Sequence, residues 1–442
     1  METPVIDFLR RFSDSGTSRF FMPGHKGRLE LSASFDITEI EGADFLLASE
    51  GIIARSESLT ASLYGAAHTL YSTQGSTLAI LAMIAAAVPR GGTLIAGRNC
   101  HAACVNGMAL LDLTPVFVAQ EGGEEGFAGR TTPQGVRRAL QEHPEASAVY
   151  ITSPDYFGIL SDVAGIAAVC REYGVPLLCD NAHGAHLCLK ERGADRLPEH
   201  PIRLGAAMTA DSAHKTLPAL TGGAYLHLAE ECYLPKARQF RRLFASTSPS
   251  YLTVASLDGC IPFLEEGGGE YAALIEENDR IRSLAREKGF FFPDGPLSDP
   301  SRIALYCPSA GYEGEELGEI VRAKGIEPEM VTPDHLVFLP SPANCREDFR
   351  RLSEVFQSLE KRPAKAVSPP PPLPIPNRGM RVQDAVFSCS ERIPVNQAEG
   401  RIAASVNCPC PPCVPLTVPG EVLDKNICEL LQYYGISHVD VV

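Results

Sequence analysis

The stretch AMTADSAHKTL at residues 207–217 decides how the rest of the sequence is interpreted. An apolar run leads into Ser-x-His-Lys, and the next apolar segment starts at Gly222. Lysine is almost never fully buried without a partner, so Lys215 between two buried strands needs a chemical reason. A partly desolvated lysine amine loses its proton readily and becomes a nucleophile that can form a Schiff base. The flanking Ser212 and His214 offer donors suited to a phosphate, although an ordinary lysine in a surface loop explains this stretch alone equally well.

A second stretch upstream adds a carboxylate. Residues 175–179 read VPLLC, an apolar strand that ends in Asp180, and NAHGAH follows at 181–186. Lys215 comes 35 positions after Asp180, which leaves room for one intervening strand and its loops. In open α/β sheets, ligands bind at the carboxyl ends of the strands. Pyridoxal phosphate needs this pair of residues, a lysine for its aldehyde and a carboxylate that keeps its pyridine nitrogen protonated.

Both stretches belong to a longer series of motifs that is spread in order over most of the chain. The motifs are FMPGHKG at 21–27, QGST at 74–77, RNCH at 98–101, SP at 153–154, DNAHGAH at 180–186 and SAHK at 212–215. In this series the chain resembles the pyridoxal-phosphate-dependent decarboxylases of ornithine, lysine and arginine. Its length resembles the compact, biosynthetic, arginine-decarboxylase-like branch of that family, whereas the acid-stress enzymes are longer and have an extra N-terminal domain.

The resemblance implies a role for each residue of the candidate site. Lys215 carries the cofactor, Asp180 pairs with its ring nitrogen, and His101 stacks on the ring. Lys215 or His183 returns a proton to the substrate carbon after the carboxylate has left. The residues implied to bind the cofactor are Gly75, Ser76, Thr77, His101, Asp180, Ala182, His183, Ser212, His214, Lys215, Thr247 and Ser248. Thr247 and Ser248 reach the phosphate of the neighbouring subunit, which implies a homodimer or a higher homo-oligomer with shared active sites.

Simpler structural interpretations stay open for several of these residues. Ser76 and Thr77 could only cap the apolar helix that follows them, since Ser and Thr are good N-caps. His101 could be a structural histidine. Residues 246–251 could be an ordinary capped start of a helix over 252–264. The family usually has a threonine where this chain has Asp155, and this carboxylate either meets a cationic substrate or faces solvent.

The composition excludes several classes of partner. A formal net charge of −15 argues against binding to nucleic acid or to an anionic membrane. Residues 1–17 form no signal segment, and no apolar run is long enough to cross a membrane. Because the 14 cysteines are scattered singly, we expect a reducing cytoplasm. Cys408, Cys410 and Cys413 are close enough for zinc, but no fourth ligand is evident, so we expect no metal.

Apolar strands alternate with helical segments, which predicts an α/β fold with a mostly parallel sheet and helices on both faces. The resemblance implies that the large domain has the fold of the fold-type-I pyridoxal-phosphate-dependent transferases. The expected parts are a PLP-binding large domain with an N-terminal arm at 1–260, a small α/β domain at 261–362, a Pro-rich linker at 363–376 and a C-terminal α+β decarboxylase domain at 377–442. Within the large domain, residues 56–71 are expected to be helical.

The expected function is decarboxylation of a basic L-amino acid, with arginine favoured over lysine and ornithine, to an amine that feeds polyamine synthesis. An aminotransferase of the same fold is one alternative. Such an enzyme fixes the substrate carboxylate with an arginine near a strand end of the small domain; the expected strand 336–339 has none, but Arg346 is close. A catalytically silent regulatory homologue is the other alternative, although it would have no physical need for Lys215, Asp180 and His214.

Overall fold

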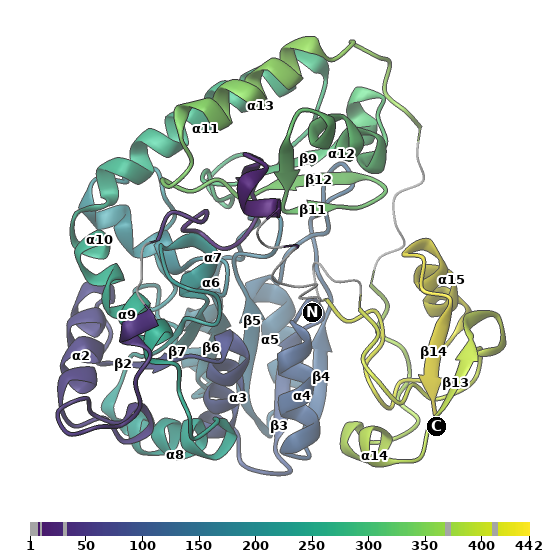
Figure 1. Ribbon diagram of the computed structural model, residues 1–442. Coiled ribbons are helices and arrows are strands. Elements are labelled where there is room, and N and C mark those ends of the chain that lie inside the picture. The colour runs from purple at the N-terminus through teal and green to yellow at the C-terminus, as the bar shows by residue number, and fades with distance from the viewer. Residues whose placement is uncertain (1–7, 9–10, 30–32, 367–372, 409–413) are drawn as a thin grey trace, which may run out of the picture.

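The centre of the protein is a seven-stranded sheet, seen in the computed structural model, which describes residues 8, 11–29, 33–366, 373–408 and 414–442 (Figure 1). Its strands lie in the order β2-β8-β7-β6-β5-β3-β4. Their bounds are β2 His68–Ser72, β3 Thr93–Gly97, β4 Thr114–Val118, β5 Ala146–Thr152, β6 Leu177–Asp180, β7 Met208–Asp211 and β8 Ala224–Leu228. Neighbouring strands are parallel except where β8 pairs with β2 and β7. The predicted, mostly parallel sheet is confirmed, with β8 as its reversed strand.

Helices cover both faces of this sheet, as predicted. Successive side chains of a strand point to opposite faces. In β3, Leu94 and Ala96 pack in a core with the helices α3, α4 and α8, whereas Ile95 packs in a separate core with α5 and α6. The bounds of these helices are α3 Gly75–Ala87, α4 Ala102–Leu110, α5 Pro133–Glu142, α6 Val163–Tyr173 and α8 Leu234–Phe244.

Residues 56–71 do not form one helix, so that prediction is wrong. Helix α2 (Ile52–Tyr64) ends at Gly65, which has a left-handed φ of 73° and donates its N–H to carbonyl groups of the last turn. Glycine is the usual residue at this position because it has no Cβ to clash. The chain then enters β2, where Leu70 and Tyr71 are buried and pair with β8.

The predicted helix over 252–264 is divided into two. Helix α9 (Tyr251–Asp258) and helix α10 (Cys260–Glu266) meet at Gly259. The Ser250 side chain caps α9 by accepting the N–H of Thr253. The cap predicted in this segment therefore exists, but Ser250 supplies it, and neither Thr247 nor Ser248 does.

A smaller sheet lies beyond the carboxyl ends of the central strands, in the upper part of Figure 1. It has the order β11-β12-β9, and its neighbouring strands are antiparallel. A separate parallel pair, β1 with β10, joins the N-terminal segment to this part of the molecule. Helices α11 and α13 lie side by side over the small sheet (Figure 1). The bounds are β1 Ser18–Phe20, β9 Ile303–Tyr306, β10 Ile326–Pro328, β11 Met330–Val331, β12 His335–Phe338, α11 Gly268–Lys288, α12 Gly314–Ala323 and α13 Arg346–Ser358.

The C-terminal segment forms a third unit, built on the antiparallel pair β13 and β14. Its elements are α14 Val382–Phe387, β13 Glu391–Pro394, α15 Lys425–Tyr433 and β14 His438–Val441. Arg98, which follows β3, is buried and donates to the carbonyl oxygens of Pro374, Pro415 and Leu416 at 2.9, 2.7 and 3.0 Å. The carboxylate of Glu421 lies 3.5 Å from the same guanidinium. This one side chain therefore anchors two separate stretches of the C-terminal segment to the end of β3.

The structure describes most of the cysteines of the chain. Among the described cysteines none is in a disulfide, and most are buried. Cys408 is one of the described cysteines, but Cys410 and Cys413 lie outside the described residues, as do the prolines at 369–372. Within the described ranges, no helix has the length and apolar character needed to cross a membrane.

Candidate active site

Lys215 lies on a single helical turn, α7 (Ala213–Thr216), between β7 and β8. Asp180 ends β6 and is paired with Ala210 of β7, so both residues lie at the same edge of the sheet. His183, three residues after Asp180, places its Nε2 atom 2.9 Å from Nζ of Lys215. The structure therefore brings the predicted lysine, histidine and carboxylate together through two adjacent strands.

The carboxylate of Asp180 is buried, with 1% of its surface exposed. One oxygen accepts the hydroxyl of Tyr150 at 2.9 Å, and the other accepts the backbone N–H of Ala182 at 3.1 Å. No lysine, arginine or histidine of the described chain forms an ion pair with it. A buried carboxylate requires hydrogen bonds and a positive partner, and a protonated heteroaromatic nitrogen would supply the second.

The start of helix α3 provides an anion site at the same edge. The N-cap residue Gln74 makes no side-chain cap, so Ser76 and Thr77 lie inside the helix rather than capping it. The Ser212 hydroxyl donates to the Ser76 hydroxyl at 2.8 Å, which joins the lysine turn to this helix start. Gly75 has a left-handed φ of 72°, and a Cβ there would meet no atom within 4 Å. Uncapped N–H groups, hydroxyls and the positive end of the helix dipole together suit a phosphate.

His214, beside the lysine, is fixed by the turn before β8. Its Nδ1 lies 3.0 Å from the carbonyl oxygen of Gly223, so Nδ1 carries the proton of the neutral ring. Burial lowers the pKa of His214 to about 4. The neutral ring then offers only an acceptor at Nε2, which leaves the Ser76 hydroxyl, the acceptor of the Ser212 hydrogen bond, better placed to donate to a phosphate.

The loop FMPGHKG packs directly against the lysine turn. The N–H of Gly24 donates to the carbonyl oxygen of His214 at 2.7 Å. A Cβ on Gly24 would lie 2.6 Å from the carbonyl oxygen of Leu217, closer than real Cβ contacts, so only glycine fits. Lys26 is buried and donates to the carbonyl oxygens of Phe21 and Leu339 at 2.6 and 2.7 Å. Burial lowers the pKa of Lys26 to about 7.

The chain with this lysine, carboxylate, histidine and anion site matches a known protein family. The description "Orn/Lys/Arg decarboxylase, major domain" matches residues 3–288, and "Orn/Lys/Arg decarboxylase, C-terminal domain" matches residues 375–438. The chain belongs to the Orn/Lys/Arg decarboxylase family. The family resemblance of the sequence motifs is confirmed, and the chain is a pyridoxal-phosphate-dependent decarboxylase by this membership.

Individual relatives agree with the family. The arginine decarboxylase of Bacillus subtilis (strain 168) is 29% identical, over 96% of this chain and 92% of the relative. The constitutive lysine decarboxylase of Escherichia coli (strain K12) is 21% identical, over 93% of this chain and 73% of the relative. The solved structure of the E. coli constitutive enzyme matches 100% of this chain and 77% of its own, with a TM-score of 0.75 at 18% identity. Francisella novicida lysine decarboxylase LdcF has a TM-score of 0.76 at 19% identity, over 91% and 73%. These structures confirm the predicted fold type.

The cofactor of Orn/Lys/Arg decarboxylases is pyridoxal 5′-phosphate, and the residues of this chain fit it. Lys215 would hold its aldehyde carbon, and Asp180 its ring nitrogen. The start of α3, with Ser76 and Ser212, would hold the phosphate. This fit rests on two observations. There is open space at Gly75, and none of the described residues is a cationic partner for Asp180.

Two predicted cofactor contacts are less direct within one chain. His101 is half-buried and caps α4, because its Nδ1 accepts the N–H of Ala103 at 3.1 Å. Thr247 and Ser248 are exposed. Their segment lies beside the start of α3, since the N–H of Ser246 donates to the side chain of Gln74 at 2.9 Å. Stacking by His101 and the contacts of Thr247 and Ser248 with a phosphate stay predictions.

Asp155 has a role that the sequence did not suggest. Its carboxylate accepts the N–H groups of Phe157 and Ile159, both at 2.9 Å, and so shapes its own loop. Burial raises the pKa of Asp155 to about 6, against the opposing effect of these hydrogen bonds. Because its Oδ1 accepts both of these backbone N–H groups, Asp155 is a loop-forming residue in this structure.

His200, Asp211 and His227 are the one group among the described residues with the spacing of a metal site. His200 Nδ1 accepts the N–H of Ile202 at 3.3 Å, so its neutral ring carries the proton on Nε2. That nitrogen lies 2.8 Å from Asp211 Oδ2, a hydrogen bond that also helps to lower the pKa of Asp211. A protonated Nε2 is not a metal ligand, so the group is a buried hydrogen-bonded cluster behind the lysine turn.

Sequence reasoning missed several residues of this site. Arg302 is 2% exposed and lies within hydrogen-bonding distance of His183. Tyr156 lies edge-on to the His183 ring at 4.8 Å and donates its hydroxyl to Glu329. Arg302 and Glu329 come from the region of the small sheet, far along the chain, and neither is part of a recognisable motif. Only the alternation of side chains along β5 could have placed Tyr150 on the same face as Asp180.

Proposed function

We propose that this chain decarboxylates a basic L-amino acid, with arginine as its preferred substrate. The observation that carries the proposal is the 2.9 Å contact between Lys215 and His183, one strand away from the buried carboxylate of Asp180. Arginine is favoured because relatives from two Bacillus species, covering more than nine-tenths of both chains, are named arginine decarboxylase. Lysine and ornithine are the alternative substrates. The amine product would feed polyamine synthesis.

The bound cofactor supplies an electron sink, which accepts the electron pair left behind by the departing carboxylate. Asp180 maintains that sink, because its negative charge holds a proton on the ring nitrogen. The start of α3 would hold the phosphate end with the Ser76 hydroxyl, which Ser212 positions, and would thereby orient the reacting bond. Lys215 would hold the aldehyde carbon in the absence of substrate. Lys215 or His183 then delivers a proton to the α-carbon.

Amine-product analysis tests this proposal. The purified holoenzyme is incubated separately with L-arginine, L-lysine and L-ornithine, and both carbon dioxide and the amine are measured. We expect one amine for each carbon dioxide, and a kcat/KM for arginine about tenfold or more above the others, since a difference of one methylene and an end group is worth that much. D-Arginine is the matched control. Amine formation mainly from lysine or ornithine would overturn the arginine preference, and no product from any of them would overturn the function.

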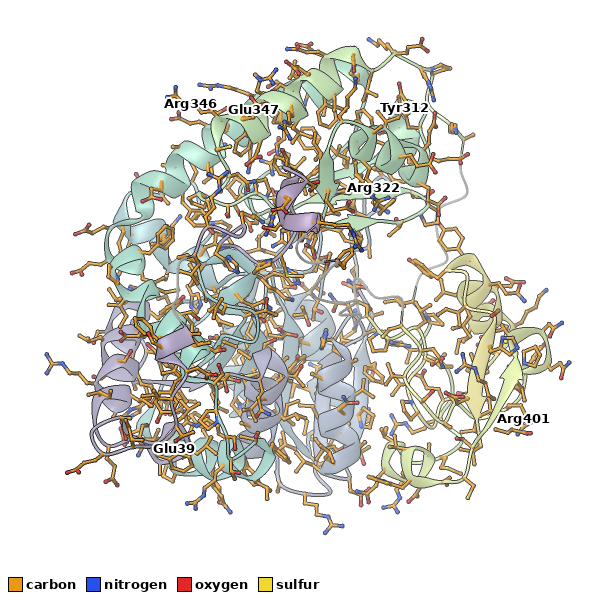
Figure 2. All side chains as sticks on the ribbon, viewed as in Figure 1. Glu39, Tyr312, Arg322, Arg346, Glu347 and Arg401 are labelled. Atoms are coloured by element: carbon orange, nitrogen blue, oxygen red, sulfur yellow. The ribbon has the colours of Figure 1, made fainter. Side chains whose placement is uncertain are left out.

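The two alternative functions have less support. Arg346 is the arginine that an aminotransferase could use to bind the substrate carboxylate. It is exposed on the outer side of α13, at the edge of the molecule in Figure 2. The buried Arg302 directs its N–H groups at Tyr156 and His183 within the chain rather than at a substrate carboxylate. A silent homologue would not need the Lys215–His183 contact. A 2-oxo acid product would identify an aminotransferase.

We also propose a homodimer with shared active sites. An apolar surface over the N-terminal segment and α2 supports it, because exposed apolar patches mark interaction sites. The large apolar side chains exposed there are Phe35, Ile37, Ile40, Ile52 and Leu59. The exposed Thr247 and Ser248 lie beside the start of α3, where a second copy of the chain could bring its own phosphate site near.

Hybrid dimers test the shared site. A Lys215→Ala chain and a Thr247→Ala/Ser248→Ala chain, each of low activity, are mixed under conditions of subunit exchange. If the two chains of a dimer share a site, each hybrid regains one intact site, and we expect up to about a quarter of wild-type activity from a random mixture, since half of the dimers are hybrids with one good site of two. Differently tagged chains, purified in tandem, show that hybrids have formed. Hybrids without regained activity would contradict the shared site.

Two further expectations remain proposals. We propose that the protein works in a reducing cytoplasm, which the lack of disulfides among its described cysteines supports. We also propose the domain limits 1–260, 261–362 and 377–442, joined by the linker 363–376. The separate sheets and the match of the C-terminal family description to residues 375–438 support them.

A further inference from the structure

The guanidinium of Arg302 meets the imidazole of His183 on the side away from Lys215. Its Nη1 donates to His183 Nδ1 at 3.1 Å and to the carbonyl oxygen of Tyr156 at 2.7 Å. Its Nη2 lies 3.4 Å from the carbonyl oxygen of His183. Arg302 and His183 are both buried, so no bulk water competes for these positions. The imidazole is therefore held between an arginine on one nitrogen and a lysine on the other.

The donor properties of these groups fix where the protons lie. A guanidinium has only donors, so His183 Nδ1 must accept and cannot carry a proton. In a neutral imidazole, the proton is then on Nε2, which faces Nζ of Lys215 at 2.9 Å. An ammonium group has three donors and no lone pair, whereas an uncharged amine can accept this N–H. The contact is thus a hydrogen bond only when the Lys215 amine is uncharged.

We infer that Arg302 is a positioning residue that fixes the Nε2–H tautomer of His183, and that this N–H holds Lys215 as an uncharged amine. The inference deepens the proposed function and rests on the proposed role of Lys215. An uncharged amine is the form that attacks a carbonyl carbon, so the arrangement prepares Lys215 to bind the cofactor aldehyde.

The electrostatic surroundings keep the His183 ring neutral. Burial lowers the pKa of His183 well below its usual value, and the neighbouring basic groups of Arg302, His101 and His214 lower it further. These groups come from three separate stretches of the chain. A second proton on the ring would place an N–H donor against the N–H donors of Arg302. The basic groups on all of these stretches disfavour that second proton.

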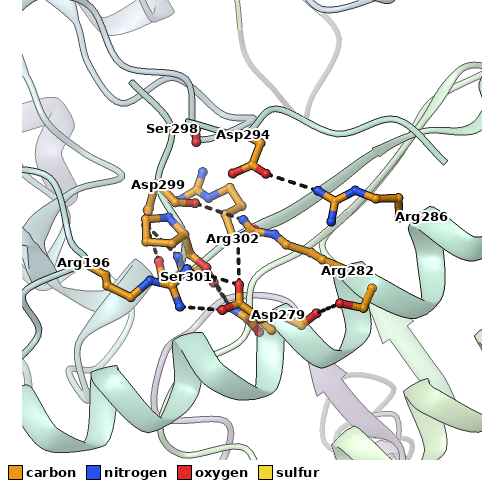
Figure 3. Close-up of polar contacts among 12 residues, drawn as sticks. Arg196, Asp279, Arg282, Arg286, Asp294, Ser298, Asp299, Ser301 and Arg302 are labelled. Atoms are coloured by element: carbon orange, nitrogen blue, oxygen red, sulfur yellow. Dashed lines mark hydrogen bonds and ion pairs between the residues drawn. The ribbon is translucent and has the colours of Figure 1, made fainter. Parts of the chain in front are cut away.

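Arg302 is itself held rigidly, as Figure 3 shows. Its backbone N–H donates to the carbonyl oxygen of Asp299 at 3.3 Å, and the buried Arg282 donates to its carbonyl oxygen. Ser301 binds the Asp299 carboxylate through both its N–H at 2.9 Å and its hydroxyl at 2.7 Å. These residues precede β9 of the small sheet. The tautomer of a histidine on the central sheet is therefore set from the small sheet.

Nitrogen NMR of the cofactor-free protein tests the tautomer directly. Histidine is labelled with ¹⁵N, and the signals of His183 are assigned by their loss in His183→Asn. In the wild-type protein we expect an unprotonated Nδ1 and a protonated Nε2 across neutral pH. In Arg302→Met, which has no donor, we expect a mixture of the two tautomers. A protonated Nδ1 in the wild-type protein would overturn the inference, and this result does not depend on whether Arg302→Met folds.

Chemical reactivity measures the consequence for Lys215. Cofactor-free protein is treated with a limiting amount of acetic anhydride at several pH values, and acetylation of each lysine is read by mass spectrometry. At pH 7 we expect Lys215 to react about three- to tenfold more slowly in Arg302→Met, the effect of losing one hydrogen bond, and Arg302→Lys to restore part of the rate. Arg241→Lys is the control, since Arg241 is equally buried and binds Glu57.

An equal loss in Arg241→Lys would show a general effect of a buried arginine, and an unchanged rate in a folded Arg302→Met would show that Arg302 has no influence on the amine. Either result overturns the inference. Neither measurement uses a substrate. If His183 has the Nε2–H tautomer but the protein forms no amine, the inference stands and the proposed function is overturned. If the protein forms the amine but His183 carries its proton on Nδ1, the proposed function stands and the inference is overturned.

Discussion

The Lys215→Ala variant is expected to lose at least about a thousandfold in turnover, which corresponds to about 4 kcal/mol of transition-state stabilisation. The variant lacks the amine that binds the cofactor and that can return a proton to the substrate. Steady-state kinetics with each basic amino acid measures the loss. Lys190→Ala is the matched control, because Lys190 is also half-buried and binds the carbonyl oxygens of Asp195 and Leu197.

Borohydride reduction of the holoenzyme gives the complementary result. The reduced cofactor should be found on the peptide that contains Lys215, and on no peptide of the Lys215→Ala variant. Label on another lysine, or full turnover in Lys215→Ala, would disprove the assignment. Circular dichroism of the cofactor-free proteins separates loss of chemistry from loss of fold.

The Asp180→Asn variant is expected to bind the cofactor and to lose about two to three decades in turnover. Asparagine preserves the shape of the carboxylate and can still accept the hydroxyl of Tyr150, but it has no negative charge to stabilise a protonated ring nitrogen. We expect kcat to fall and KM to change little, since the substrate does not touch this residue in the proposed arrangement. Kinetics and cofactor titration measure the two effects separately.

Asp162→Asn is the control for this loss of charge. Asp162 caps helix α6 through the N–H of Gly165, and asparagine is an equally good cap, so stability and turnover should stay near the wild-type values. Turnover of Asp180→Asn within a few-fold of the wild type would refute the role of this carboxylate. Failure of the variant to bind the cofactor would show instead that Asp180 acts in affinity.

The core of the site could be predicted from the sequence because it depends on local patterns. An apolar strand that ends in a carboxylate and a lysine after the next strand must lie at one edge of a parallel sheet. The structure accordingly places Asp180 beside Ala210 and joins His183 to Lys215. The alternation of strands and helices likewise determines which face each helix covers.

Other features depend on contacts that no local pattern encodes. Arg302 stands in the unremarkable sequence Asp299–Pro–Ser–Arg, and only the docking of the small sheet brings it to His183. Asp155 turns its charge to its own backbone, which the residue type alone cannot reveal. The strand β2 was missed although Gly65, a helix-ending residue, stood in front of it. There the apolar content resembled a continuing helix more than the start of a short strand.

The pairing of β1 with β10 has a consequence for biosynthesis. Ser18 pairs with Ile326, so the ribosome must add 308 residues before the first strand of the described chain meets its partner. At about 5–20 residues per second, this wait lasts roughly 15–60 seconds. The loop that follows β1 contributes Gly24 to the lysine turn, and it too stays without its final support until then. The β1 segment is thus ordered only after the small sheet has been synthesised, and the lysine turn gains the full support of this loop at the same stage.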